Sequence, residues 1–467
     1  MFDRRAFLSA SAATYVFSAP ALALQSDFVR PEDFGAIGDG VTNDTNAFAA
    51  MSDHINRAGG GTIVLRRTTY IVGRQSPGRQ DEYAFVPAKI IDLESLSRPL
   101  LIEGNGARLK CAAGLRYGTF DRQSGEPTQR TMPNYDISEI GAPYHAMIRL
   151  TGCKAPVTVR DIELDGSLPE LRIGGTYGDT GRQLPATGLL LRDNSGTETV
   201  TGVHSHHHGL DGIQIDGVNI RAARSRFQNV VSEYNGRQGL SLVGGTGYDF
   251  SNCQFNHTGR SVLVSAPAAG VDIEAEGGKT VTDVKFAECK FMNNVGCGMV
   301  ADMGPSREAT FSRCTFVGTT AWSAWPNKPL FRFDDCTFVG AIVRAPTEAD
   351  PRDRARFVRC TFSDDPALSP TGIVYTAPDT GGPIADLNEE GNPVFVGCVF
   401  KLIGKGRLPW SIKATYEDCT MSQASPDRAY PRGTYLGRNV ITGPVDLYWS
   451  RIVGDVILNG KLVPPYA

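Results

Sequence analysis

The 467-residue sequence lacks any surplus of positive charge: 47 Lys and Arg residues stand against 50 Asp and Glu, for a net charge of −3. Without a basic field the chain is a poor partner for nucleic acid, and we expect none. Beyond the N-terminal segment it also lacks any run of eighteen apolar residues, so no membrane span is predicted. What it has instead is one repeated phrase.

This phrase places two outer aromatic residues five positions apart around a central Cys, and it recurs every 21 to 38 residues. Its copies are FSNCQF (250–255), FAECKF (286–291), FSRCTF (311–316), FDDCTF (333–338), FVRCTF (357–362), FVGCVF (395–400) and the weaker YEDCTM (416–421). A recurring unit marks a solenoid, in which each unit buries its apolar face against its neighbours. The units are too short for a helix pair and carry strand-forming residues, so the sequence predicts an all-β parallel β-helix.

Seven of the ten cysteines occupy the centre of the phrase. They are Cys253, Cys289, Cys314, Cys336, Cys360, Cys398 and Cys419. A disulfide framework is the alternative, but it is typical of short secreted domains without a core, and a chain of this length has no such need. We therefore expect free thiols stacked as a ladder inside the solenoid.

Residues 1–23 resemble a twin-arginine export signal. Arg4 and Arg5 precede a modest apolar stretch, which ends at a small-residue cleavage site near 21–23. The resemblance implies a periplasmic or secreted protein that folds in the reducing cytoplasm before export, where thiols stay free. The alternative is a chance pair of arginines before a weak apolar run.

A glycine-rich motif, DFGAIGDGVTNDT (33–45), follows the signal and leads into a helix-like stretch with Phe48, Met51 and Ile55 on one face. Three glycines at 59–61 end that stretch before a strand. The whole segment resembles the opening of the pectate-lyase-like superfamily of right-handed β-helix proteins, in which a short helix plugs the first coil.

The resemblance implies a right-handed parallel β-helix with an N-terminal capping helix, acting on a polysaccharide or oligosaccharide. We predict a cap with a helix over 24–61, the β-helix over 62–440, and C-terminal strands over 441–467. In the last segment Asn459-Gly460 indicates a hairpin, which could cap the final coil or form a homo-oligomer contact. The chain departs from the polygalacturonase pattern, because the relevant strands carry no adjacent Asp pair and no Gly-His-Gly follows them; it also lacks a clear pectate-lyase calcium set.

The same repeat rule aligns four strands that each follow a Gly, with Ile213, Leu240, Val271 and Met299 pointing inward. One outward column then holds Gln214, Ser241, Asp272 and Val300, and the next holds Asp216, Val243, Glu274 and Asp302, with Arg192 one coil earlier. Rungs lie about 4.8 Å apart and alternate residues about 6.5–7 Å apart, so the carboxylates crowd together. Crowding should raise at least one pKa toward the range of a general acid. The alternative is a solvated acidic face or a cation-binding strip.

We predict Asp272, Glu274, Asp302 and Asp216 as catalytic residues. The predicted substrate-binding residues are Arg192, Gln214, His206, His207, His208, Asp211, Glu233, Tyr234, Arg237, His257 and Arg260, and His204 lies beside them. Most of them directly precede the aligned strands, at what we expect to be one edge of one sheet. Long insertions at 111–145 and 167–187 could wall the groove, or could be mere decoration of coil edges.

The run His206-His207-His208 could supply a base or a metal ligand. Consecutive histidines in a turn cannot all face one ion, and no second His/Cys cluster completes a zinc pattern, so we predict substrate contact or a turn role and no metal site.

Three functions remain open from the sequence. The first is hydrolysis of a glycosidic bond by a carboxylate pair, which needs no cofactor. The second is β-elimination on a uronate polymer, for which His207, His257, Tyr234, Arg237 and Arg260 are candidates and a calcium ion is possible. The third is a non-catalytic polysaccharide-binding solenoid, in which the acidic strip has no chemical role.

Overall fold

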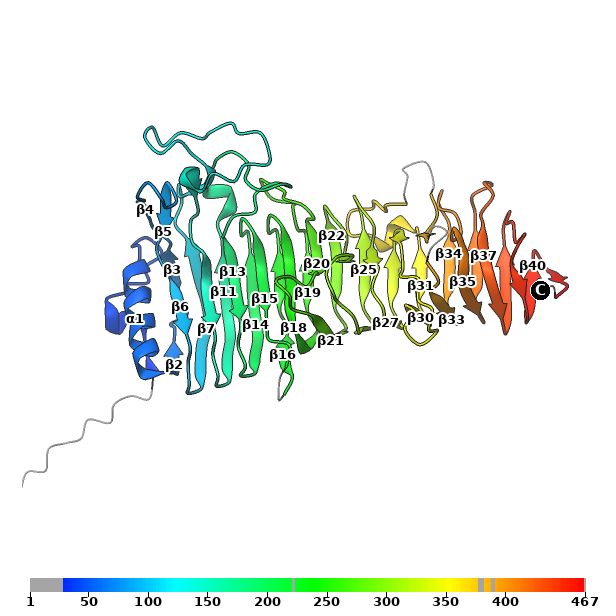
Figure 1. The fold of residues 1–467 in the computed structure, drawn as a ribbon, viewed down its shortest axis with the longest axis horizontal. Helices are drawn as coiled ribbons and strands as arrows, with labels where there is room; N and C mark the ends of the chain where they lie inside the picture. The colour runs from blue at the N-terminus through cyan, green and yellow to red at the C-terminus, as the bar shows by residue number, and fades with distance from the viewer. Residues whose placement is uncertain (1–27, 221–222, 377–381, 388–390, 466–467) are drawn as a thin grey trace, which may run out of the picture.

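A computed structural model describes residues 28–220, 223–376, 382–387 and 391–465. The chain winds into one long solenoid that runs from helix α1 (Thr45–Ala58) to the C-terminal strands (Figure 1). Parallel strands of each coil pair with the coil before and the coil after. The predicted parallel β-helix with a capping helix and a terminal hairpin is confirmed.

Each coil contributes strands to three faces. The first face contains β6 (Ile91–Glu94), β10 (Ala146–Thr151), β13 (Thr187–Arg192), β15 (Asp211–Asp216), the start of β18 (Gln238–Ser251), β20 (Ala269–Ile273), β23 (Met299–Ala301), β26 (Ala324–Pro326), β29 (Ile342–Val343) and β32 (Ala385–Asp386). The second face contains β1 (Phe28–Val29), β2 (Gly61–Val64), the first halves of β7 (Leu100–Cys111), β11 (Val157–Asp165) and β14 (Glu198–His206), β16 (Ser225–Gln228), the end of β18, β21 (Val281–Ala287), β24 (Ala309–Ser312), β27 (Phe331–Asp334), β30 (Arg356–Val358), β33 (Val394–Val396), β35 (Ser411–Glu417), β37 (Pro431–Leu436) and β39 (Arg451–Ile452). The third face contains β3 (Thr69–Val72), the second halves of β7, β11 and β14, β17 (Val231–Glu233), β19 (Gln254–Asn256), β22 (Lys290–Asn294), β25 (Thr315–Gly318), β28 (Thr337–Val339), β31 (Thr361–Ser363), β34 (Val399–Leu402), β36 (Thr420–Gln423), β38 (Arg438–Thr442) and β40 (Asp455–Leu458).

A left-handed corner between the second and third faces explains the repeated phrase. Strand alternation alone would put two residues five positions apart on opposite sides of a sheet. The residue before each Cys has a positive φ, which turns the chain and brings both aromatics inward. These corner residues are Asn252 (51°), Glu288 (58°), Arg313 (53°), Asp335 (56°), Arg359 (52°), Gly397 (61°) and Asp418 (55°).

The inward aromatics form two stacked ladders on either side of the cysteines. In one ladder Phe286, Phe311 and Phe333 follow one another with ring centroids 4.9 and 4.8 Å apart. In the other, Phe316 and Phe338 stack at 4.8 Å. All ten cysteines are free and buried, including the seven of the repeat, as the sequence predicts. The seven cysteines of the repeat thus form a third row, the cysteine ladder, in which each thiol is a small apolar side chain in the core.

Thiol reagents should label few of these cysteines in the native protein and most of them in denaturant. Reducing agent should leave the melting temperature unmoved, because no disulfide links the described cysteines. Cys314→Ser is expected to cost about 1–3 kcal/mol, since a buried hydroxyl needs a well-placed acceptor. The carbonyl oxygens of Phe286 and Ser312 lie 3.6 and 3.5 Å from the Cys314 sulfur. Because a C–O bond is shorter than a C–S bond, a serine hydroxyl would lie farther from both of them. Rapid native labelling would contradict the ladder.

The two ends of the solenoid are built differently. Helix α1 buries Phe48, Met51 and Ile55 over the first coil. In the motif before it, the Asp44 carboxylate accepts hydrogen bonds from the amides of Ile37 (2.7 Å) and Gly38 (3.1 Å), which is a structural role in the turn. At the other end, β40 pairs antiparallel with β41 (Lys461–Val463) through the Asn459-Gly460 turn, as predicted.

Both long insertions, together with residues 75–87, form an overhang above the N-terminal coils (Figure 1). Its small sheet consists of β4 (Gln75–Pro77), β5 (Phe85–Pro87), β8 (Arg116–Thr119), β9 (Ile140–Gly141) and β12 (Arg172–Ile173). The Arg116 guanidinium lies 4.0 Å from the Phe85 ring centroid and fixes two of these strands to each other. The insertions are therefore ordered structure rather than loose edge loops.

The predicted export signal, residues 1–23, lies outside the described residues. Within the described chain, α1 and the short 3-10 helices fall below the length and apolarity that a bilayer-crossing helix requires.

Candidate functional site

The outward columns of the first face form as the sequence predicts, with one exception. Gln214, Ser241 and Asp272 are register partners on β15, β18 and β20, and Val300 follows on β23. In the next column, however, Asp216 pairs with Gly244 through a β-bulge, and Val243 is buried. The expected place of Val243 in that column is wrong, because the bulge adds one residue to β18.

Asp272 lies at the centre of an acidic cluster and is only 4% exposed. Its Oδ2 accepts a hydrogen bond from Gln238 Nε2 at 2.7 Å. Burial first, and the charge of Glu274 second, raise the pKa of Asp272 to about 8, although Arg237 opposes the shift. At neutral pH this carboxyl therefore keeps its proton and can donate it.

Glu274 lies two residues further along the chain and is partly exposed. Burial and the neighbouring Glu276 raise its pKa, against the opposing charges of Arg237 and Lys328. Asp302 lies on the same side of the cluster, where its Oδ1 accepts a hydrogen bond from Asn327 Nδ2 at 2.9 Å. The three carboxylates interact as the predicted crowding implies: the charge of Glu274 raises the pKa of Asp272, and the charge of Asp302 raises the pKa of Glu274.

Asp211 and Arg237 extend this cluster below the surface. The Asp211 side chain is fully buried, and neither of its carboxylate oxygens has a hydrogen-bond partner among the described residues. Burial raises its pKa to about 6, although Arg237 opposes this. For Arg237 burial disfavours the charge, but Asp211 and Asp272 outweigh it and raise the pKa of the guanidinium. Since Asp211 is enclosed, it acts on the site through charge rather than through substrate contact.

Asp216 has a different environment from the other three predicted catalytic residues. Its Oδ2 lies 3.0 Å from Arg192 Nε, and its Oδ1 lies 2.5 Å from Lys279 Nζ. Lys279 also reaches Asp193 Oδ1 at 2.7 Å. Two cations therefore bind this carboxylate in an ion-pair network at the edge of the first face.

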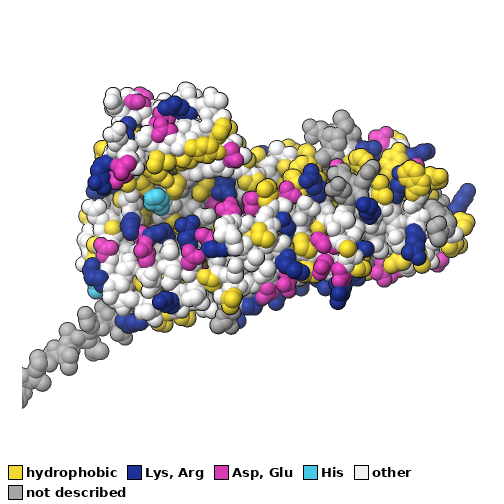
Figure 2. All heavy atoms as spheres, viewed as in Figure 1, with side chains coloured by type: hydrophobic (Ala, Val, Ile, Leu, Met, Phe, Trp, Pro, Cys, Tyr) yellow, Lys and Arg dark blue, Asp and Glu magenta, His cyan; other side chains and the backbone are white. Residues whose placement is uncertain are grey.

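A cavity of about 430 Å³ lies over the first coils, where the overhang meets the first face. His145, Arg149, Arg192, Leu210 and Gln214 are among its lining residues. Figure 2 shows this hollow under the overhang, with acidic and basic side chains on its floor. Gln214 lines the cavity and is also the first residue of the column that leads through Ser241 to Asp272, so the cavity and the acidic cluster lie along the same face.

The histidines do not share an edge with the carboxylates, and the expectation of one sheet edge is wrong. His204 and His206 lie on the third face, paired with Glu163 and Asp165 of the previous coil. The chain turns sharply after β14 before it enters β15 on the first face. The sequence alone could not reveal this turn, because only four residues, 207–210, separate the two strands and no pattern in them marks a change of face.

One residue in this turn has a positive φ in each coil, and its side chains stack in a row. His207 (55°) stacks on Tyr234 (55°) at 5.1 Å, and Tyr234 stacks on His257 (57°) at 4.8 Å. Burial lowers the pKa of both His207 and His257, which are therefore neutral at pH 7. Arg260 is held nearby by the Asn293 carbonyl (3.1 Å) and Thr319 Oγ1 (3.0 Å).

His208 lies in the core and not on the predicted binding surface. It is fully buried, its Nδ1 lies 2.8 Å from the Tyr144 hydroxyl, and its Nε2 lies 3.1 Å from the Leu164 carbonyl. Burial lowers its pKa to about 3, so the ring stays neutral. A side chain enclosed in this way cannot contact a polysaccharide, so its predicted substrate-binding role is wrong.

Several residues of the site escaped the sequence analysis. Gln238 precedes Gly239 just as Asp211 precedes Gly212, so the rung alignment contained the signal for it. Lys279 and Lys328 gave no signal, because each reaches the site from a turn: Lys279 contacts Asp193, 86 residues away. Glu163, whose Oε1 lies 3.1 Å from His206 Nε2, and Arg108, which lies 3.0 Å from Glu163, were also missed, because both lie on coils before the aligned repeats.

Comparisons with known proteins agree with the fold. Residues 148–339 match a family model described as "Right handed beta helix region". Depolymerase 1, capsule KN3-specific, of Klebsiella phage KN3-1 is 22% identical over 362 residues, which cover 67% of this chain and 39% of that protein. Mannuronan C5-epimerase AlgE6 of Azotobacter vinelandii is 27% identical over 229 residues, 46% of this chain and 23% of that protein. The chain thus matches less than half the length of either relative.

Among solved structures, the A-module of the Azotobacter vinelandii mannuronan C-5 epimerase AlgE4 is 16% identical, covers 91% of this chain and 99% of its own, and superimposes with a TM-score of 0.46. The parallel register of all three faces and the matched family model are the stronger observations. Together they identify this chain as a right-handed parallel β-helix protein.

Proposed function

We propose that the protein is a carbohydrate-active enzyme that hydrolyses glycosidic bonds of a polysaccharide in the groove of the first face. The observation that carries this proposal is the pair formed by Asp272 on β20 and Glu274 just after the end of that strand. The first is held protonated at neutral pH, and the second is partly exposed beside it. Glycosidases require one carboxylic acid and one carboxylate on either side of the scissile bond.

In this mechanism Asp272 donates its proton to the leaving oxygen. Glu274, once ionised, activates water or attacks the anomeric carbon. Gln238 orients Asp272 through its amide hydrogen bond, and Asp302 tunes Glu274 by charge. Asp216 supports the groove from its ion-pair network with Arg192 and Lys279.

Basic side chains of the first face are candidates for contact with acidic groups of the polymer. Arg149, Arg192 and Lys328 lie before and after the carboxylate pair; Arg149 is paired with Asp92 and Arg192 with Asp216, so an acidic sugar would compete with these carboxylates. A guanidinium binds a sugar carboxylate through two parallel hydrogen bonds. The names of the relatives, a capsule depolymerase and a mannuronan epimerase, support a polysaccharide substrate.

A second candidate is β-elimination on a uronate polymer, favoured by the stack of His207, Tyr234 and His257. Its histidines have lowered pKa values and are neutral bases at pH 7. With Arg260 nearby to bind a carboxylate, they could remove a proton next to it. This chemistry would take place on the other side of the turn from the acidic pair.

Two assays on one panel of acidic polysaccharides distinguish these reactions. We expect new reducing ends without absorbance in the near ultraviolet, because hydrolysis creates no double bond. Ultraviolet absorbance that rises with the reducing ends would replace hydrolysis by β-elimination. Binding without either product after long incubation would leave a non-catalytic polysaccharide-binding protein.

A further inference from the structure

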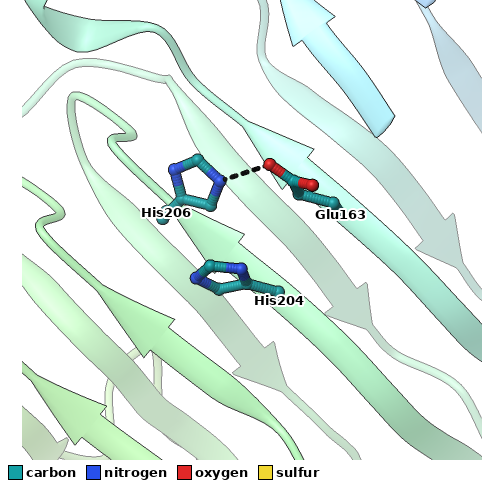
Figure 3. Close-up of side chains that lie close together, drawn as sticks. All are labelled: Glu163, His204 and His206. Atoms are coloured by element: carbon teal, nitrogen blue, oxygen red, sulfur yellow. Dashed lines mark hydrogen bonds and ion pairs between the residues drawn. The ribbon is translucent and has the colours of Figure 1, made fainter. Parts of the chain in front are cut away.

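The third face carries a cluster of side chains that can bind a metal ion, separate from the acidic pair of the first face. Glu163 lies on β11, and His204 and His206 lie two residues apart on β14, so both histidines project from the same side of the strand. Glu163 is the register partner of His204, and its Oε1 lies 3.1 Å from His206 Nε2. Figure 3 shows the three side chains converging, with the ring of His204 below the Glu163–His206 pair.

The spacing of the three groups suits a metal ion. One ligand atom from each lies within 4.8 Å of the others. In a tetrahedral zinc site, bonds of about 2.0–2.2 Å place ligand atoms roughly 3.3–3.6 Å apart. Small side-chain rotations would close the difference, because the two imidazole centroids are already 4.4 Å apart.

Each of the three groups has an outer partner that orients it. His204 Nε2 lies 3.1 Å from Glu233 Oε1, which leaves Nδ1 as its ligand atom. His206 Nδ1 lies 2.7 Å from His207 Nδ1, which leaves Nε2 for the ion. Glu163 Oε1 lies 3.0 Å from Arg108 Nε. The hydrogen bonds of His204 with Glu233 and of His206 with His207 are of the kind that fixes the tautomer and orientation of metal-bound histidines.

The charges around the cluster favour a divalent cation. Glu163, Asp165 and Glu233 supply three carboxylates, and Asp165 Oδ1 lies 3.7 Å from His206 Nδ1. Arg108 is the cation that contacts two of them, Glu163 and Asp165. Apart from the imidazoles, three carboxylates and one guanidinium leave this set with two more acidic than basic groups, an excess that a divalent ion would neutralise.

We propose that Glu163, His204 and His206 form a binding site for a divalent transition-metal ion of the zinc type. Imidazole nitrogens suit zinc and its neighbours, whereas calcium takes oxygen ligands alone. The three consecutive histidines do not all face the ion: His206 binds it, His207 orients His206, and His208 points into the core. The side chain of His204 is 41% exposed, so the site remains open to solvent on one side. The site is independent of the hydrolysis proposed above.

The test uses full-length protein without an affinity tag, stripped with a chelator and titrated with zinc by calorimetry. We expect one zinc per chain, and little or no heat with calcium. His206→Ala and Glu163→Gln should each weaken zinc binding at least about tenfold, the loss typical of a disturbed ligand shell. His145→Ala, which removes an exposed histidine from the first-face cavity, is the matched control and should bind zinc unchanged.

A second readout covers variants that fold poorly. Zinc should raise the melting temperature of the stripped wild type and of His145→Ala, because an ion that binds only the folded state stabilises it. At the same zinc concentration it should raise the melting temperature of Glu163→Gln less, because weaker binding stabilises the folded state less. Anomalous scattering from a zinc-soaked crystal should place the ion between the three residues. Equal zinc binding by wild type, His206→Ala and Glu163→Gln, or an ion located elsewhere, would overturn the proposal.

Discussion

Replacing Glu274 by Gln is expected to reduce the release of reducing ends by about 10²–10⁴-fold, the contribution that a positioned acid or base makes to catalysis. The amide keeps the shape of the side chain but can neither attack nor activate water. The thermal transition should hardly change, since Glu274 is partly exposed. Initial rates and melting curves on the same preparations measure both effects.

Glu276→Gln provides the matched control. Glu276 is an exposed carboxylate two residues further along, and it contributes to the same cluster by charge. Its replacement should lower the pKa of Glu274 and shift the pH profile of the rate without abolishing it. Full activity of Glu274→Gln, or equal loss in both variants, would remove Glu274 from the mechanism.

Asp272→Asn is expected to abolish activity and to stabilise the protein at alkaline pH. The folded protein holds the Asp272 proton up to a pKa of about 8, whereas the unfolded chain releases it near the ordinary value of 3.8. Between these values the folded state binds more protons, so wild-type stability falls as pH rises from about 4 to about 8. The neutral amide does not ionise and escapes this loss.

Melting temperatures at pH 5 and pH 9 test this expectation. From pH 5 to pH 9 the melting temperature of the variant should rise by about 2–6 °C relative to that of the wild type, as a pKa shift of this size implies for a chain of this length. Glu276→Gln, which removes an exposed carboxylate, should show no comparable gain. In the wild type, kcat/KM should fall as pH rises through about 8, when Asp272 loses its proton. If the melting temperatures of the variant and the wild type change equally between pH 5 and pH 9, Asp272 is already ionised in the folded protein.

The repeated phrase determines most of what could be predicted. Because each phrase fixes one corner of a coil, aligning the cysteines also aligned the strands, and Gln214, Ser241 and Asp272 fell into one column as expected. Burial of the cysteines followed from the same alignment. Periodic contacts between neighbouring coils are the part of a solenoid that its sequence shows directly.

Features that interrupt the period could not be predicted. The bulge that moves Gly244 opposite Asp216 adds one residue without changing the pattern of apolar side chains. The turn at His207 separates the histidines from the carboxylates, although they are close in sequence. Lys279 joins Asp216 from a turn 63 residues away, and no local pattern marks such a contact.

The coil-to-coil pairing also bears on the order in which the chain can fold. In the described part of the three faces each parallel strand pairs with the coil before or after it, so a new coil needs contacts only with its neighbour, and the longest loops to close are those that carry the insertions, such as the one between Ile91 and Ile148. Structure can start at α1 and grow coil by coil. The carboxylates, the cavity and the histidine cluster all lie before residue 329. The complete groove could thus assemble on the ribosome while the last quarter of the protein is still being synthesised.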